Sequence, residues 1–83
     1  PRLVLGRGSE CDVRSDDPGI SRRHAEIRVH GTGPDAQILV VDLGSTNGTL
    51  VDGVRAAQAP LSDGSRIVLG STIVDVHRRA SRR

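Results

Sequence analysis

Residues 37–53 read QILVVDLGSTNGTLVDG, and this stretch indicates how the rest of the chain is organised. The apolar run from Gln37 to Leu43 predicts a strand near the centre of a sheet. Glycines bound the polar loop that follows, Gly44 to Gly48, and Thr49 to Val51 again has the composition of a strand. Asp52-Gly53 is a typical hairpin turn. The stretch therefore predicts a strand, a loop, a second strand and a turn in immediate succession.

The same organisation continues on both sides of this stretch. Ala25, Ile27 and Val29 alternate with polar residues, and this period of two predicts a half-buried strand. Alanines at 56, 57 and 59 alone suggest a helix, although Pro60 weakens that interpretation. About seven short strands, separated by turns roughly every eight to twelve residues, predict a β-sandwich or a barrel. The remaining strands are expected at Arg2–Leu5, Cys11–Arg14, Arg66–Leu69 and Thr72–His77.

The composition limits both the core and the function. The 83 residues make one small domain, and they include no Phe, Trp, Tyr, Met or Lys. The core must therefore consist of Leu, Val, Ile and Ala. The absence of Lys excludes a P-loop and a Schiff base, and the absence of aromatic residues excludes a stacking platform for single-stranded nucleic acid. The longest aliphatic run, Ile38 to Val41, is too short to cross a membrane.

The net charge of +2 arises at the C-terminus, where four arginines lie among the last six residues. Residues 1–77 hold eight arginines and ten acidic residues, so they lack the basic surface of a nucleic-acid binder. We take residues 1–77 as the domain and residues 78–83 as an Arg-rich tail. The single cysteine, Cys11, cannot form an internal disulfide, and we expect a cytoplasmic protein.

Three polar loops carry the residues that suggest a binding site. They contain Gly6-Arg7, Ser21-Arg22-Arg23-His24 and Ser45-Thr46-Asn47-Gly48, each at the end of an expected strand. Loops of a sandwich gather at its two ends. If these three share an end, guanidinium groups, a hydroxyl and an amide surround one point, which is the chemistry that binds an oxyanion such as phosphate. The residues of this predicted anion site are Arg7, Ser21, Arg22, Thr46 and Asn47.

These loops resemble the forkhead-associated (FHA) domain, a module that binds phosphothreonine. The resemblance extends in order over nearly the whole chain. It implies an all-β sandwich of two twisted sheets, with about eleven short strands in the complete fold and the binding loops at one end. The Arg-rich, Lys-free composition is similar to that of high-GC bacterial proteins, in which FHA domains serve Ser/Thr-kinase signalling. The matching pieces are Gly6-Arg7, Ser21–His24, Asp42–Thr49, Val51–Gly53 and, more weakly, Leu61–Gly70.

The resemblance also implies a role for each residue of the site. Arg7 matches the arginine that grips the phosphate, Ser21 matches the serine that bonds a phosphate oxygen, and Arg22 is similar to the third phosphate ligand. Thr46 matches the residue that helps form the pocket for the phosphothreonine methyl group. Asn47 matches the amide that bonds the peptide backbone after the phosphothreonine.

Three further residues resemble supporting positions of the family. Gly6 is expected to let the chain turn so that Arg7 points inward. His24 is expected to pack and bond beneath the two loops, and Gly48 to supply a positive φ next to Asn47. The family often reads the third residue after the phosphothreonine, and the loop Asp16–Ile20 is a candidate for that reading. Its two acidic residues suggest that acidic peptides are disfavoured.

We expect no catalytic site, metal or cofactor. His24, His30 and His77 are scattered, and the chain has no G-x-S-x-G nucleophile motif. The expected partner is a phosphothreonine-containing protein, with no nucleic acid and no membrane insertion. The alternative is an FHA fold that serves as a phosphate-independent interaction or dimerisation scaffold. The family usually has one more strand before the piece that matches Arg2–Leu5. We therefore expect residues 1–77 to lack the first strand of the fold and to belong to a larger, multidomain chain.

Overall fold

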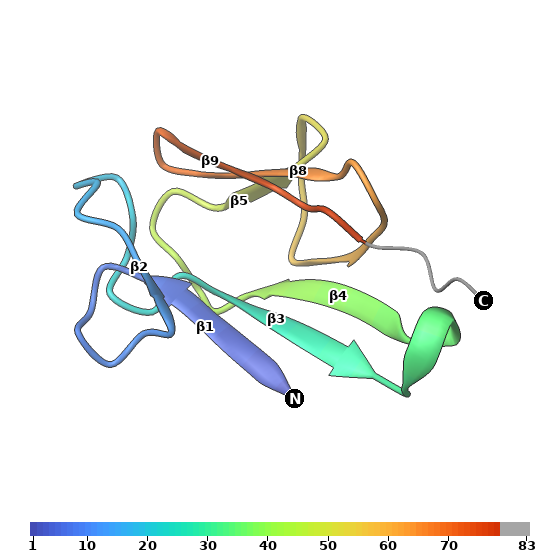
Figure 1. Cartoon of the computed structure of the whole chain (residues 1–83). Helices are drawn as coiled ribbons and strands as arrows, with labels where there is room; N and C mark the ends of the chain where they lie inside the picture. The colour runs from blue at the N-terminus through green and yellow to red at the C-terminus, as the bar shows by residue number, and fades with distance from the viewer. Residues whose placement is uncertain (79–83) are drawn as a thin grey trace.

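The computed structural model describes residues 1–78, which form nine strands and one short 3₁₀ turn in two stacked sheets (Figure 1). This arrangement confirms the predicted sandwich, and neither sheet closes into a barrel. The elements are β1 Arg2–Gly6, β2 Val13–Arg14, β3 Ala25–His30, η1 Gly33–Asp35, β4 Gln37–Asp42, β5 Thr49–Val51, β6 Val54–Arg55, β7 Gln58–Leu61, β8 Arg66–Leu69 and β9 Thr72–Asp75.

The connection between β4 and β5 joins the two sheets. The five-stranded sheet has the order β2-β1-β3-β4-β7, and the four-stranded sheet has the order β6-β5-β8-β9. Neighbouring strands are antiparallel except β1 and β2, which are parallel. Because β4 and β5 belong to different sheets, the loop at residues 43–48 must cross from one layer to the other at the end of the sandwich.

The core lies between the sheets and is aliphatic, as the composition requires. The register pairs Leu5 with Ala25 and Ile27 with Val40, so the alternating residues of β3 share the inner face with those of β1 and β4. Ile67 of β8 joins the same cluster from the other sheet and is completely buried. Burial of each large aliphatic side chain contributes about 1.5–3 kcal/mol. The buried cluster consists of Leu5, Ile20, Ala25, Val40, Val51, Leu61, Ile67 and Leu69.

The region after β5 differs from the expectation. The Asp52-Gly53 hairpin is confirmed, and its φ values of +50° and +84° are those of a type I′ turn. The alanines that follow are not helical, because Gln58–Leu61 forms β7 beside β4. Pro60 is tolerated there since β7 is an edge strand, where a missing N–H leaves no ladder bond unmade. The short strands β6 and β7 account for the two elements beyond the expected seven.

The loops divide between the two ends of the sandwich. The β1–β2, β2–β3, β4–β5 and β8–β9 connections gather at the left in Figure 1, and η1 and the β7–β8 turn lie at the opposite end. Arg78 adjoins that opposite end, because its Nη2 donates to the Pro34 carbonyl and its N–H donates to Asp63. The rest of the expected tail, residues 79–83, lies outside the described residues. No helix in residues 1–78 is long and apolar enough to span a membrane.

Candidate functional site

The end of β1 is joined to the Ser21-Arg22 segment through its backbone. The Arg7 N–H donates to the Ser21 carbonyl at 3.0 Å, and the Gly8 N–H donates to the Arg22 carbonyl at 3.0 Å. A Cβ at Gly6 would lie 2.2 Å from the Arg22 oxygen, which is far inside contact distance. Gly6 is therefore required for close approach of the two segments. Gly6 is the last residue of β1 and its φ is not positive, so this close approach, and not a left-handed conformation, requires a glycine there.

Arg7 is exposed, but one of its nitrogens is anchored. Its Nε donates to the Ile20 carbonyl at 2.7 Å. The two terminal nitrogens make no hydrogen bond with any residue in the range 1–78, and they keep their four N–H donors for an external acceptor. The anchor restricts the side chain before any ligand arrives, so binding costs less conformational entropy.

The Ser21 hydroxyl connects the second and third loops. Its Oγ accepts a hydrogen bond from the Thr46 N–H at 3.1 Å. A hydroxyl has one hydrogen to donate as well as lone pairs to accept with. Because Ser21 accepts this bond, its own hydroxyl hydrogen is still available to an oxyanion. Such an oxyanion would lie next to Arg7, whose N–H already donates to the Ser21 carbonyl.

His24 lies completely buried between the same two loops. Its Nδ1 accepts the Ser21 N–H at 3.1 Å, and its Nε2 lies 2.7 Å from the Gly48 carbonyl. Because Nδ1 is an acceptor, the proton of the neutral ring resides on Nε2, which donates to Gly48. One imidazole thus fixes the backbone of both loops.

Asp42 organises the loop that crosses between the sheets. Its carboxylate accepts hydrogen bonds from the Gly44 and Ser45 N–H groups and from the Ser45 and Thr49 hydroxyls. The Ser45 Oγ in turn accepts the Gly48 N–H at 2.9 Å. Burial raises the pKa of the Asp42 carboxyl, but these hydrogen bonds outweigh burial and hold it below the usual 3.8.

Asp17 fastens the Asp16–Ile20 loop to the opposite sheet. Its carboxylate accepts from the Gly19 N–H at 2.8 Å, the Ser71 N–H at 2.7 Å and the Thr72 hydroxyl at 2.9 Å. Hydrogen bonds from Gly19, Thr72 and Ser71, in that order of effect, lower the pKa of Asp17 below 3.8. The Asp17 carboxylate is thus bonded within the fold and stays ionised, and the suggestion that acidic peptides are disfavoured stays a prediction.

Asn47 and Gly48 form the exposed tip and the buried base of the third loop. The Asn47 Nδ2 donates to the Gly19 carbonyl at 2.9 Å, which leaves its Oδ1 and its second N–H for a peptide backbone. Gly48 has φ +85°, as expected. This left-handed conformation is strained for other residues.

Arg22 is the one predicted phosphate ligand that an acidic side chain already neutralises. Its Nη2 lies 3.2 Å from the Glu10 Oε1. Its carbonyl accepts hydrogen bonds from the Gly8 N–H and from the Cys11 Sγ, the latter at 2.9 Å. The backbone of Arg22 is therefore fixed, while its guanidinium faces a carboxylate that would compete with a phosphate.

The structure thus brings Arg7, Ser21, Thr46 and Asn47 to one end through direct contacts between their loops, with Arg22 beside them. Sequence reasoning missed Glu10 as part of this end, and it missed the hydrogen bonds by which Asp17 holds its loop. Within residues 1–78, no group of three His, Cys, Asp or Glu side chains is placed to hold a metal ion. What this end offers is an array of N–H and O–H donors that includes the guanidinium groups of Arg7 and Arg22.

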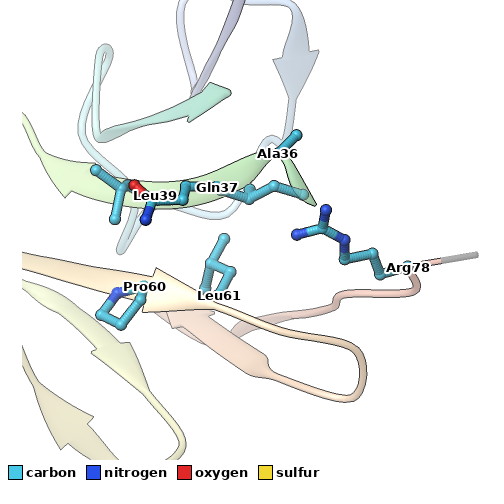
Figure 2. A pocket seen from close by; sticks show the side chains of 7 residues that line it. Ala36, Gln37, Leu39, Pro60, Leu61 and Arg78 are labelled. Atoms are coloured by element: carbon cyan, nitrogen blue, oxygen red, sulfur yellow. The ribbon is translucent and has the colours of Figure 1, made fainter. Parts of the chain in front are cut away.

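A hollow of about 280 Å³ lies at the other end of the molecule, between β4 and β7 (Figure 2). Its walls are mostly apolar, and the guanidinium of Arg78 reaches its rim. It includes none of the residues predicted to bind a ligand. The lining consists of residues 36–39, Pro60, Leu61 and Arg78.

Comparison with known proteins relates this chain to one family. A family model described as "FHA domain" matches residues 3–70. The chain is 43% identical over 77 residues to the FHA domain-containing protein FhaA of Mycobacterium tuberculosis, which is 89% of this chain and 14% of FhaA. It is 39% identical over 70 residues to the glycogen accumulation regulator GarA of Mycolicibacterium smegmatis, which is 84% of this chain and 42% of GarA. The chain thus spans less than half of either relative.

A solved structure gives the same relationship in three dimensions. A chain from a structural and functional analysis of phosphothreonine-dependent FHA domain interactions superposes with a TM-score of 0.88. The two are 38% identical, and the match covers 96% of this chain and 79% of that one.

Proposed function

This chain belongs to the FHA-domain family, and we propose that its Arg7–Ser21–Asn47 end binds phosphothreonine in a partner protein. The observation that carries the proposal is the joining of Arg7, Ser21 and Thr46 through bonds between their loops, with donors left over. Arg7 and Ser21 bind phosphate oxygens, and Arg22 is the third phosphate ligand. Asn47 binds the peptide backbone that follows.

A phosphate monoester suits this array better than a carboxylate does. It carries about −1.5 to −2 charges at pH 7 and three acceptor oxygens. Hydrogen bonds to a charged group contribute about 1.5–3 kcal/mol each, so several donors in one place give strong selection. An Asp or Glu side chain has one charge and flat geometry, and it cannot engage Arg7, Ser21 and Arg22 together.

Selection of threonine over serine depends on one methyl group. Thr46 lies exposed beside Ser21 and forms one wall of the proposed methyl pocket. A fitted apolar pocket distinguishes ligands that differ by one methyl group by about 1–3 kcal/mol. Phosphoserine peptides should therefore bind measurably more weakly than phosphothreonine peptides.

The proposed activity is recruitment, without chemistry on the ligand. A Ser/Thr protein kinase phosphorylates the partner protein. This domain then binds the phosphorylated partner and recruits it to the protein of which the domain is a part. The structure places His24 completely buried with both ring nitrogens bonded, which favours a supporting role over a catalytic one. A module that reads kinase products works where ATP-dependent kinases act, so the proposal places this domain in the cytoplasm.

Fluorescence anisotropy with three labelled degenerate peptide libraries tests the proposal. The libraries carry phosphothreonine, phosphoserine or unmodified threonine, and a label is necessary because the protein has no Trp or Tyr. We expect micromolar binding of the phosphothreonine library, weaker binding of phosphoserine and none of threonine. Affinity should also fall below about pH 6, as the phosphate gains its second proton. Absence of binding from a folded protein would favour the phosphate-independent scaffold instead.

A further inference from the structure

Arg55 lies against the third loop, although it belongs to another element. It is the last residue of β6 and pairs with Leu50 of β5. Its guanidinium extends along the sheet face to Gly48, where a Cβ would meet the Arg55 Nε at 2.6 Å and Cζ at 2.8 Å. The guanidinium therefore lies against Gly48, the residue that follows Asn47.

The charge of Arg55 is not neutralised within residues 1–78. The side chain is exposed, and it makes no hydrogen bond or ion pair with a described residue. Arg22, on the other side of the site, is paired with Glu10. Arg55 and Arg22 therefore differ, because Arg22 is paired with a carboxylate and Arg55 is not.

The carboxylates of Asp17, Asp42 and Asp52 lie on segments next to this side of the site, and each accepts at least one hydrogen bond within the fold. Asp42 accepts four hydrogen bonds from residues 44–49, and Asp52 accepts the Arg66 N–H. None of these carboxylates forms an ion pair with Arg55 within residues 1–78. A cation beside a peptide-binding amide selects ligands through charge complementarity.

We propose that Arg55 is a specificity-determining residue that selects peptides with an Asp or Glu on the C-terminal side of the phosphothreonine. The inference rests on the proposed function, in which Asn47 binds the backbone just after the phosphothreonine. In this proposal, a residue of β6, and not the Asp16–Ile20 loop, recognises the peptide residues that follow the phosphothreonine. A side-chain carboxylate of the bound peptide forms an ion pair with the Arg55 guanidinium.

A peptide scan measures this selection directly. Labelled peptides with phosphothreonine in an alanine background carry a single Asp, Asn or Lys at each of the four following positions, with amidated C-termini so that no terminal carboxylate contributes. At one position we expect Asp to bind about two- to fivefold more tightly than Asn, the range of an exposed charge pair. Higher salt should reduce the difference.

Three variants attribute the effect to Arg55. Arg55→Gln should abolish the Asp preference and leave the affinity for the Asn peptide unchanged. Arg55→Glu should reverse the preference so that Lys is favoured at the same position. Arg2→Gln is the matched control, because Arg2 is exposed on β1 and its one ion pair is with Glu26 at 3.7 Å. It should bind all the peptides as the unmodified protein does.

The outcomes separate this inference from the function on which it rests. Phosphothreonine binding without an Asp preference, or with a preference that survives in Arg55→Gln, overturns the role of Arg55 and leaves the proposed function standing. If no phosphothreonine peptide binds a folded protein, both fail together. An Asp preference lost in Arg55→Gln and reversed in Arg55→Glu establishes the inference.

Discussion

The two ends of the sandwich are held together in different ways. At the binding end, side chains bond the backbone of distant loops: Arg7 to Ile20, His24 to Ser21 and Gly48, and Asn47 to Gly19. At the other end, the turns are closed mainly by neighbours, and Arg78 adds hydrogen bonds to the Pro34 carbonyl and to Asp63. The Ala36 N–H donates to the Gly33 carbonyl, and the Ser62 N–H donates to the Ser65 hydroxyl.

This difference indicates what a binding site on loops requires. Loops lack the apolar faces that hold strands in place, so another force must order them before the ligand arrives. A network of hydrogen bonds between loops does so, and the ligand then meets donors that are already positioned. The turns at the other end need only reverse the chain. Substitutions in the network should therefore affect stability and binding together, and substitutions in the distant turns should affect neither strongly.

The largest effect is expected from His24→Ala. It removes a buried ring and leaves the Ser21 N–H and the Gly48 carbonyl without partners, which should cost about 3 kcal/mol. Thermal unfolding followed by far-UV circular dichroism should show a Tm lowered by roughly 10–20 °C. His30→Ala, exposed at the end of β3, is the control and should shift the Tm little. An unshifted Tm in His24→Ala would remove the ring from the network.

Arg7→Ala should abolish most of the binding and leave the fold intact. Loss of two or more charge-assisted hydrogen bonds corresponds to an affinity about 100-fold lower. The Tm should fall only slightly, since one hydrogen bond to Ile20 is lost. Anisotropy with the phosphothreonine library measures the affinity, and Arg2→Ala serves as control. Unchanged affinity would place the phosphate elsewhere.

Acid should weaken the fold through the two loop carboxylates. The pKa values of Asp17 and Asp42 are lowered in the folded protein. Their contribution to stability is therefore complete above the usual 3.8 and is lost as the pH falls through the lower folded values. Chemical denaturation between pH 7 and pH 3 should show this loss.

Asp42→Asn provides the test of that assignment. The difference in the free energy of unfolding between Asp42→Asn and the unmodified protein should shrink as the pH falls. Asp35→Asn, in the exposed η1 turn, is the matched control at the opposite end and should follow the unmodified protein at every pH. A constant difference between Asp42→Asn and the unmodified protein down to pH 3 would show that the charge of Asp42 plays no part.

The smallest effect is expected from Glu10→Gln. The Glu10 carboxylate pairs with Arg22 in the free protein and adds negative charge beside the phosphate. Its neutralisation should raise the affinity for phosphothreonine about two- to fivefold, the range of an exposed ion pair. The gain should diminish in 0.5 M salt. A loss of affinity instead would mean that Glu10 positions Arg22 for the ligand.

The sequence predicted the elements whose signals are local. The alternation in Ala25–His30 and the Asp52-Gly53 turn depend on neighbouring residues, and both are confirmed. β7 was missed because an edge strand that contains Pro60 has weak strand propensity. Here tertiary pairing with β4 decided the conformation.

The supporting residues of the site were harder to predict. Asp42 bonds groups two to seven residues away, so its position before a Gly-Ser loop carried a usable signal. Asp17 bonds Ser71 across 54 positions, and Arg55 reaches Gly48 only because a hairpin returns it there. No pattern along the chain marks such contacts, since they depend on how the two sheets are stacked.

The central claim is that the binding end, and not the hollow beside Arg78, receives the phosphothreonine. The most direct test is a titration of the ¹⁵N-labelled protein with N-acetyl-phosphothreonine N-methylamide, followed by ¹H–¹⁵N NMR. The account predicts shifts confined to residues 6–8, 20–24 and 45–48, including the Arg7 Nε–H. Shifts at residues 36–39 and Leu61, with the three loops unaffected, would contradict it.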